Sequence, residues 1–194
     1  MTRRIAILGL ILAPLLGAAS PPIATYAMSS DSMRPNLEKG DLVGADMLEG
    51  MCGKTRPQPG DVVVYRPKDK AQPYLGRVVA GPGQTLRMRR GRLVIDGRTV
   101  PAARVAEAPN GSGAVVQETL GNGRSYFTLT SGEEALFDEI APVRLGPQDW
   151  YILGDNRDDA SDSRIWGPFE NKDICAVATV ILQAKDKKRV GAKP

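Results

Sequence analysis

Short apolar runs rich in β-branched residues, separated by turn residues, occupy most of the chain after residue 37. The turns draw on 21 glycines and 15 prolines among 194 residues, whereas aromatic residues make up only 5%. This pattern is typical of a turn-rich β protein and does not suit a helical bundle. We therefore predict a single, mainly β domain. Its strand-like runs lie at 41–47, 61–67, 75–81, 92–100, 125–130, 149–153 and 174–182.

Turn signals and composition divide this domain further. An Asp-Gly pair at 96–97 stands between two strand-like triplets and predicts a tight hairpin, because both central residues of such a turn need positive φ. Residues 84–145 are expected to form a hairpin or excursion from the main domain, and glycine-rich 106–124 is expected to be an exposed loop within it. The domain itself should span 29–184, followed by a basic, disordered tail at 185–194.

The N-terminus combines a basic start with an uncharged stretch that extends from Ile5 to Ser30. A membrane span needs about 20 mostly apolar residues, and the segment 1–28 holds enough of them. Arg3 and Arg4 precede the apolar run, so the N-terminus of such a span would be cytoplasmic. A cleaved secretory signal fits the same features. Both interpretations place the main domain outside the cytoplasm.

The chain contains no histidine and only two cysteines. The missing histidine excludes Ser-His-Asp and Cys-His catalytic sites and every His-ligated metal site. Two cysteines alone cannot complete a zinc or iron–sulfur site, so we expect no metal and no cofactor. Outside the cytoplasm Cys52 and Cys175 can pair, or each can be buried as a small apolar residue. A hydrolase built from this chain needs a lysine or a carboxylate as its base.

Four motifs in a fixed order carry the chemistry. The first is Ser-Asp-Ser-Met-Arg-Pro-Asn-Leu at 30–37, directly after the uncharged segment, and the last is Gly-Asp-Asn-Arg-Asp-Asp-Ala-Ser-Asp-Ser-Arg at 154–164. Between them lie Gly-Asp-Val-Val-Val at 60–64 and a strand motif at 74–83. Together they make the chain resemble signal peptidase I, the membrane-anchored serine protease that removes signal peptides from exported proteins. The resemblance extends from about residue 5 to residue 183.

The resemblance implies an antiparallel β fold with one N-terminal transmembrane helix, and it favours a retained anchor. It makes Ser32 the nucleophile, and it gives Ser30 a hydroxyl that helps the Ser32 amide to hold the oxyanion. The residues expected to support the active site are Arg77, Asp155, Arg157, Asp162, Ser163 and Arg164. The apolar residues expected to line the pockets for an extended substrate are Met33, Leu37, Val78 and Val79.

One position departs from the family. Its general base is a lysine directly before an arginine in the strand motif, whereas this chain has Gly76 before Arg77. Among the other lysines, Lys68 and Lys70 lie between the two strand motifs and are the best-placed substitutes. A second departure is Ala160, where the family often has a serine within reach of the lysine amine.

Three hypotheses follow. The first is a signal peptidase I, single-pass in the plasma membrane with its main domain outside, acting as a monomer on signal peptides of exported preproteins at the bilayer surface. The second is an inactive or impaired homologue that binds peptides as an accessory membrane protein, because loss of a serine protease's base costs about 10⁴–10⁶ in kcat. The third is a specialised processing protease of a conjugation or secretion system. No nucleic-acid partner is expected, although arginines gather at Arg87, Arg89, Arg90 and Arg92.

Overall fold

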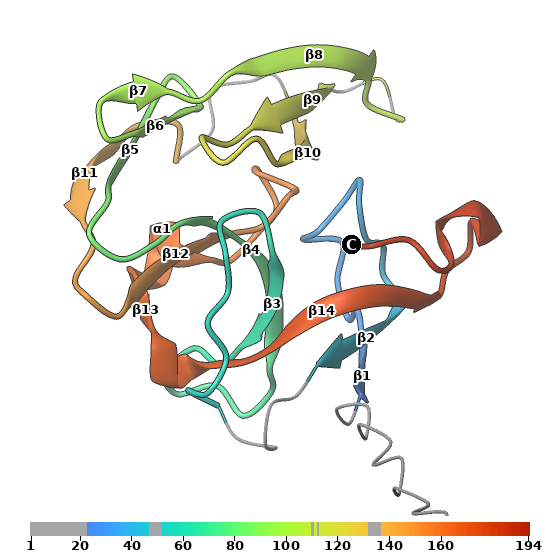
Figure 1. Cartoon of the computed structure of the whole chain (residues 1–194). Helices are drawn as coiled ribbons and strands as arrows, with labels where there is room; N and C mark the ends of the chain where they lie inside the picture. Colours follow the sequence, from blue (N-terminus) through green and yellow to red (C-terminus); the bar gives the residue numbers. More distant parts are fainter. Residues whose placement is uncertain (1–22, 47–51, 110, 112, 132–136) are drawn as a thin grey trace, which may run out of the picture.

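The computed structural model describes residues 23–46, 52–109, 111, 113–131 and 137–194, and within them the strands form three sheets (Figure 1). The largest is a seven-stranded antiparallel sheet in the order β1-β2-β14-β3-β4-β12-β13. The strands of this main sheet are β1 Ile23–Ala27, β2 Leu42–Asp46, β3 Val62–Tyr65, β4 Tyr74–Ala80, β12 Asp149–Leu153, β13 Phe169–Glu170 and β14 Ile174–Gln183. The prediction of a mainly β, antiparallel fold is confirmed.

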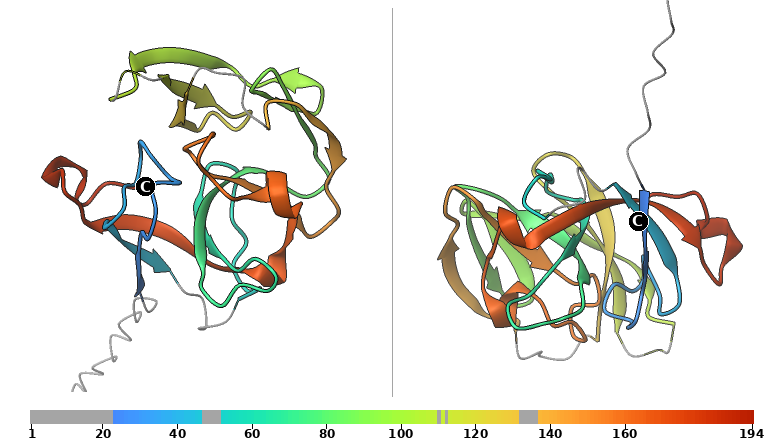
Figure 2. Two further views of the ribbon diagram at one scale, coloured as in Figure 1. Left: turned by 180° about the vertical axis from the view of Figure 1, so that it is seen from behind. Right: turned by 90° about the horizontal axis from the view of Figure 1, so that it is seen from below.

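The chain between β4 and β12 forms the other two sheets. The four-stranded sheet contains β5 Thr85–Arg89, β6 Arg92–Ile95, β7 Arg98–Thr99 and β11 Ile140–Arg144. The three-stranded sheet contains β8 Ala102–Glu107, β9 Ala114–Thr119 and β10 Ser125–Thr130. The two views of Figure 2 show that this excursion folds back over one side of the main sheet.

Two predictions about the excursion have different outcomes. The Asp-Gly hairpin is confirmed, because Asp96 and Gly97 have φ values of 50° and 76° and connect the paired strands β6 and β7. The expected exposed loop at 106–124 is wrong in part. Its central residues form β9, which pairs with strands on both sides and buries Glu118.

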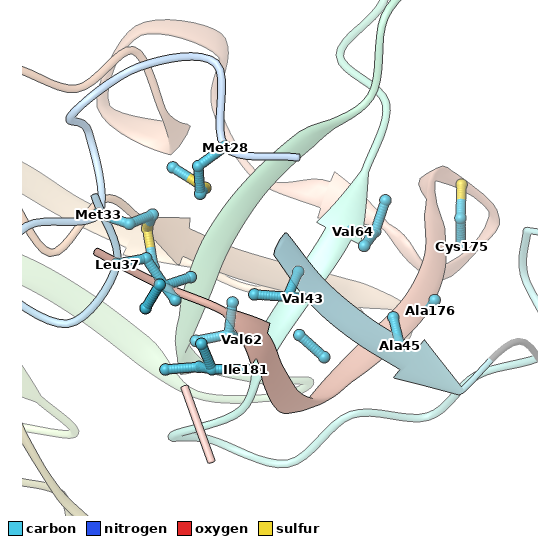
Figure 3. Packing of buried hydrophobic residues seen from close by; sticks show 12 residues of the cluster. Met28, Met33, Leu37, Val43, Ala45, Val62, Val64, Cys175, Ala176 and Ile181 are labelled. Atoms are coloured by element: carbon cyan, nitrogen blue, oxygen red, sulfur yellow. The ribbon is translucent and has the colours of Figure 1, made fainter. Parts of the chain in front are cut away.

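The main sheet is covered on both faces in its centre. Val62 and Val64 belong to one buried cluster, and the alternating residues Val63 and Tyr65 belong to another. This explains why β3 is a continuous apolar run, since a strand buried on both faces has no polar side. Figure 3 shows the first cluster, where Met33 packs beside the β3 and β14 side chains. The loop after β1 is thereby anchored in the core.

Three short helices complete the described fold: α1 Ser163–Trp166, η1 Asn171–Asp173 and η2 Lys187–Arg189. Cys52 and Cys175 form a disulfide, which decides the alternative that the sequence left open. The prediction of a disordered C-terminal tail is wrong, because the tail forms η2 and its backbone bonds back to Ile181.

The predicted membrane anchor at 1–28 falls mostly on residues 1–22, which lie outside the described residues. Its bounds are wrong at the C-terminal end, because residues 23–27 form β1 and pair with β2, so the main domain begins before residue 29. In the part of the chain that the structure describes, no helix has the length and apolarity that crossing a bilayer requires.

Candidate active site

A cleft of about 640 Å³ lies where the ends of two strands of the main sheet meet a polar loop. The end of β1 and the residues after it supply Ala27, Met28, Ser29, Ser30 and Ser32. The start of β4 and the residues before it supply Gln72, Pro73, Tyr74 and Leu75. The loop supplies Asp158, Asp159, Ala160 and Ser161. Segments from the first, third and fourth motifs therefore meet in one cleft.

The two serines of the first motif contact each other in this cleft. The Ser30 hydroxyl donates to the Ser32 hydroxyl at 3.1 Å and lies 3.5 Å from the Ser32 amide, from which it accepts. The two hydroxyls and the Ser32 amide therefore form one small hydrogen-bonded group. The neighbouring side chain of Met33 is fully buried, which holds the Ser32 backbone against the core while its hydroxyl faces the cleft.

The loop after β12 bonds to two backbone carbonyls of residues 28–41, the loop that carries the predicted nucleophile Ser32 and is called the nucleophile loop below. The Asn156 amide donates to the Ser32 carbonyl at 3.0 Å, and the Asn156 side-chain Nδ2 donates to the Asp31 carbonyl at 3.2 Å. A side chain at Gly154 would place its Cβ 2.7 Å from the Ser32 carbonyl oxygen. Glycine at 154 is thus required for the close approach of the two loops.

Asp155 is the centre of the buried support. Arg77 Nε and Nη2 donate to the two Asp155 oxygens at 2.8 and 2.7 Å, and both side chains are at least 96% buried. Asn36 Nδ2 adds a third bond to Asp155 at 2.7 Å. Burial alone would lower the pKa of Arg77, but the adjacent Asp155 carboxylate outweighs it and raises that pKa. Asp155 therefore connects β4 to the nucleophile loop through two different partners.

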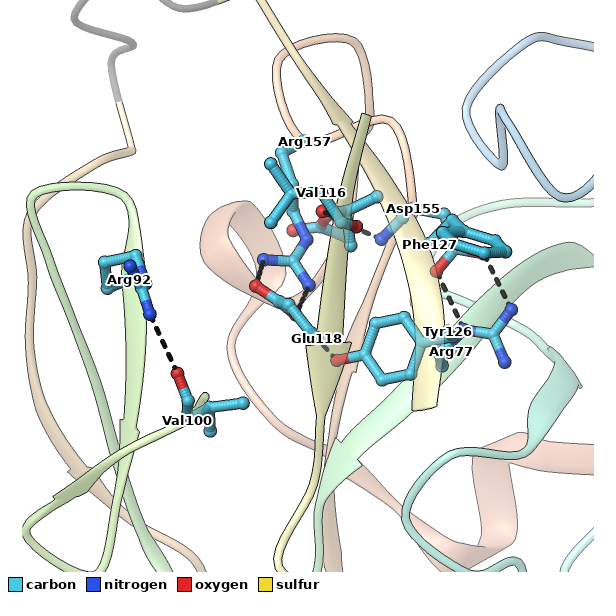
Figure 4. A network of polar contacts seen from close by, with 12 residues as sticks. Arg77, Arg92, Val100, Val116, Glu118, Tyr126, Phe127, Asp155 and Arg157 are labelled. Atoms are coloured by element: carbon cyan, nitrogen blue, oxygen red, sulfur yellow. Dashed lines mark hydrogen bonds and ion pairs between the residues drawn. The ribbon is translucent and has the colours of Figure 1, made fainter. Parts of the chain in front are cut away.

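A second buried pair ties the excursion to the same loop (Figure 4). Arg157 donates from both terminal nitrogens to Glu118 of β9, at 3.0 and 2.5 Å. The Tyr126 hydroxyl also donates to Glu118, at 2.8 Å, and the Arg77 guanidinium lies 4.7 Å from the centre of the Tyr126 ring. Burial, followed by the Glu118 charge, raises the pKa of Tyr126 well above its usual value. Tyr126 therefore lies between two arginine–carboxylate pairs, with its hydroxyl bonded to Glu118 and its ring beside Arg77.

Asp162 and Arg164, at the end of the last motif, form a buried ion pair with each other. Arg164 donates from Nε and Nη2 to the Asp162 oxygens at 2.9 and 2.7 Å, and Asp162 also accepts from the Gly154 amide at 3.0 Å. The Ser163 hydroxyl accepts from the Ile152 amide at 2.9 Å. All six residues predicted to support the site therefore have buried hydrogen-bond partners, and none of the six lines the cleft itself.

Gly76 lies in a space that hydrocarbon fills. A Cβ at this position would meet Ile152 Cγ2 at 2.6 Å and Tyr65 Cε1 at 3.0 Å, and both of these side chains are fully buried. Contacts below 3.0 Å force a neighbour to move, and a buried, branched Ile152 has little freedom to do so. A side chain at position 76 would therefore require Ile152 or Tyr65 to move.

The candidate substitute lysines are elsewhere. Lys68 and Lys70 line a separate cavity of about 370 Å³ together with Trp166 and Phe169. Lys172 pairs with Glu170 at 2.7 Å on the surface. Among the described residues, no lysine lines the Ser32 cleft, so the structure does not bring a substitute base to Ser32.

The four residues predicted to line substrate pockets are placed in the core. Met33 and Leu37 belong to the cluster beside the cleft, whereas Val78 and Val79 belong to the two clusters on opposite faces of the sheet. None of the four lines the cleft. Leu75, which the sequence analysis did not select, lines it instead.

Three further polar residues escaped the sequence analysis. Glu118 and Tyr126 were missed because no local pattern connects β9 and β10 to the last motif. Asn36 was read only as part of a motif, although its side chain bonds to Asp155 and to the Phe127 carbonyl at 2.6 Å. The Asp31 carboxylate, which stands between the two serines, accepts from the Lys39 amide at 3.0 Å. Within the described residues, no three side chains of His, Cys, Asp or Glu are placed to hold a metal ion.

Comparison with known proteins gives consistent matches. A signal peptidase I of Pseudomonas aeruginosa is 32% identical over 175 residues, covering 78% of this chain and 58% of that protein. Signal peptidase I S of Bacillus subtilis is 26% identical over 160 residues, covering 82% of this chain and 76% of that protein. The chain spans only 52–58% of the length of the relatives from P. aeruginosa, Pseudomonas fluorescens and Rickettsia canadensis.

A crystal structure of a signal peptidase I from Enterococcus faecalis is 20% identical, with 64% of this chain and 98% of that chain covered and a TM-score of 0.40. The family described as signal peptidase, peptidase S26, matches residues 1–183. The resemblance drawn from the four motifs is thereby confirmed, and the chain belongs to the signal peptidase family S26.

Proposed function

We propose that this chain is a serine endopeptidase of signal peptidase type that cleaves signal peptides from exported preproteins, at a rate limited by the absence of a side-chain base. The observation that carries the proposal is the Ser30–Ser32 pair in an open cleft between two strand ends. The family of the chain supports the same reaction.

The cleft suits an extended peptide. β12 pairs with β4 from Arg77 onward, so among the described strands the first residues of β4, Tyr74 and Leu75, have their backbone paired only on the β3 side. β1 likewise pairs with β2 alone, on one side. Both strand ends border the cleft. A peptide entering there can pair its backbone with them, while the cleft receives its side chains.

Ser32 would attack the scissile carbonyl and form an acyl-enzyme, releasing the amine of the mature protein. The Ser32 amide and the Ser30 hydroxyl would hold the oxyanion, and one such donor contributes about 3 kcal/mol to the barrier reduction. With Gly76 at the base position, the Ser32 proton must leave to water or hydroxide. We therefore expect turnover about 10⁴–10⁶-fold below that of a serine protease with its base.

The location belongs to the same proposal. The part of the predicted anchor that precedes β1, residues 1–22, would hold a monomeric chain in the plasma membrane with its N-terminus in the cytoplasm and its main domain outside. Ser32 follows β1 closely, so the cleft would stay near the bilayer surface, where a signal peptide presents its cleavage site.

The test is cleavage of a signal-peptide substrate by the purified chain and by its Ser32→Ala variant. We expect slow cleavage at one bond that the variant lacks. Cleavage of equal rate in both proteins would contradict the assignment of Ser32 as nucleophile. Ser29→Ala is the matched control, because Ser29 lines the same cleft but belongs to neither serine contact.

A second candidate is peptide binding without turnover, as an accessory membrane protein. The observation that favours it is the hydrocarbon packed around Gly76, which leaves Ser32 without an amine while the cleft stays open. Binding of a signal peptide to the parent chain with no Ser32-dependent cleavage over days would select this candidate. Measurable Ser32-dependent cleavage would exclude it.

A further inference from the structure

The C-terminal segment folds back beside the loop that carries Ser32. After β14, the Ile181 amide donates to the Ala192 carbonyl at 2.9 Å, and the Gly191 amide donates to the Ile181 carbonyl at 2.8 Å. Asp186 caps η2 by accepting from the Lys188 amide at 3.0 Å. Both Figure 1 and Figure 2 show the C-terminus next to the loop between β1 and β2.

Arg189 connects this segment to the nucleophile loop. Its Nη1 donates to the Asn36 carbonyl at 3.1 Å and to Asp41 Oδ2 at 2.6 Å, while Nη2 donates to Asp41 Oδ1 at 3.2 Å. Asp41 is 1% exposed, and its Oδ2 also accepts from the Glu38 amide at 2.8 Å. The Arg189 side chain is 18% exposed, so this is a largely buried, bidentate contact.

The contact reaches Ser32 through Asn36. The Asn36 amide donates to the Met33 carbonyl at 3.1 Å, which closes the turn that follows Ser32. Its side chain bonds to Asp155, whose neighbour Asn156 holds the Ser32 carbonyl. Arg189 of the C-terminal segment therefore holds the Asn36 backbone carbonyl, and Asp155 of the last motif holds the Asn36 side-chain amide. Without Arg189, one of these two restraints is lost.

We propose that Arg189 is a positioning residue for Ser32, fixing the nucleophile loop from the C-terminal segment. This inference rests on the proposed function, because it assigns Arg189 to the geometry of the nucleophile. A guanidinium is suited to the task, since its fork spans a carboxylate and a carbonyl together. Lysine would keep the charge and lose the second contact.

The test compares Arg189→Ala, Arg189→Lys and the matched control Lys188→Ala, which removes an exposed neighbour from the same turn. The readout is the labelling of Ser32 by a fluorophosphonate probe, with its maximal rate separated from its half-saturating concentration. We expect Arg189→Ala to lower the maximal rate about 10- to 100-fold, as misplacement of a reacting group does. Arg189→Lys should recover part of the loss, and Lys188→Ala should label like the parent.

Hydrogen exchange of the 33–41 amides, measured on the same proteins, separates the inference from the proposed function. If the probe labels the parent no faster than Ser32→Ala, the proposed function fails and exchange alone decides the inference. Faster exchange of 33–41 in Arg189→Ala, with Lys188→Ala unchanged, supports positioning by Arg189. Parent-like exchange of 33–41 in Arg189→Ala overturns the inference, and so does parent-like labelling where the parent is labelled.

Discussion

The region around the last motif and the region around Gly76 are built very differently. On the side of the last motif, three carboxylates bind three arginines in buried pairs: Asp155 with Arg77, Asp162 with Arg164 and Glu118 with Arg157. On the β4–β12 side, the space at Gly76 is occupied by the apolar side chains of Ile152 and Tyr65. One side is a polar network and the other is ordinary hydrocarbon core.

Because of this difference, the residues that hold the Ser32 backbone are separate from the position predicted for the base. The polar network fixes the backbone around Ser32 through the Asn156 and Gly154 contacts, and none of its bonds requires an amine at position 76. Under the proposed function, Ser32 and its surroundings are kept while the base is absent from position 76. Close packing favours the apolar filling that the structure shows there.

The largest effect is expected from restoring an amine on the apolar side. Gly76→Lys together with Ile152→Ala should raise the kcat for a signal peptide by at least about a hundredfold, part of the 10⁴–10⁶-fold that a base contributes. Gly76→Lys alone should gain much less, because its Cβ clashes with the Ile152 methyl. Steady-state cleavage assays measure both.

Ile152→Ala alone is the control for this prediction, since it opens the cavity without adding an amine. It should lose about 2–5 kcal/mol of unfolding free energy and gain no activity. A single Gly76→Lys variant as active as the double variant would show that the apolar side has room for the base.

On the polar side, Asp155→Ala should lower the unfolding free energy by about 3–5 kcal/mol, because it leaves the Arg77 charge buried without its partner. Asp159→Ala, in the exposed part of the same loop, should change it by less than about 0.5 kcal/mol. Urea denaturation of both variants gives the comparison. If both variants lost equally little unfolding free energy, the Arg77–Asp155 pair would not stabilise the loop after β12.

A smaller effect on the unfolding free energy is expected from Tyr126, which lies between the Arg77–Asp155 and Arg157–Glu118 pairs. The raised pKa of Tyr126 means that, above the ordinary phenol value of about 10, the unfolded chain releases a proton that the folded chain retains. Stability should therefore fall as the pH rises past 10. Tyr126→Phe should make this fall shallower, at a cost of about 1 kcal/mol at neutral pH for the lost bond to Glu118.

Urea unfolding at pH 7 and pH 10.5 measures the Tyr126 contribution. Burial also raises the pKa of Tyr151, to about 12, so a residual alkaline loss remains in the variant. An alkaline slope identical in parent and variant would contradict the retained proton at Tyr126.

The β class and the hairpin at 96–97 were predicted from the sequence, because these depend on local patterns. The two serines and the supporting arginines were predicted through the resemblance that the four motifs carry. Glu118 and Tyr126 were not, since they reach the loop through the pairing of β9 with β10 and the docking of that sheet, which no local pattern encodes. A loop-like composition at 106–124 even pointed away from a buried carboxylate.

Position 76 shows a different limit. The sequence predicts that a base lysine is missing at this position, and it offers Lys68 and Lys70 as substitutes because both are near in the chain. Their actual place depends on how the β3–β4 connection folds, and the structure puts them in the cavity beside Trp166. Distance along the chain does not determine which side of a strand end a loop covers.

The pH dependence of Ser32 acylation tests the central claim most directly. It would be measured on the parent chain with the fluorophosphonate probe from pH 6 to pH 10, with Ser32→Ala as the blank. Without a side-chain base, the logarithm of the rate should rise with a slope of about one over this whole range, because hydroxide takes the proton. A plateau with an apparent pKa between 6 and 9, removed by substitution of one lysine, would contradict the account.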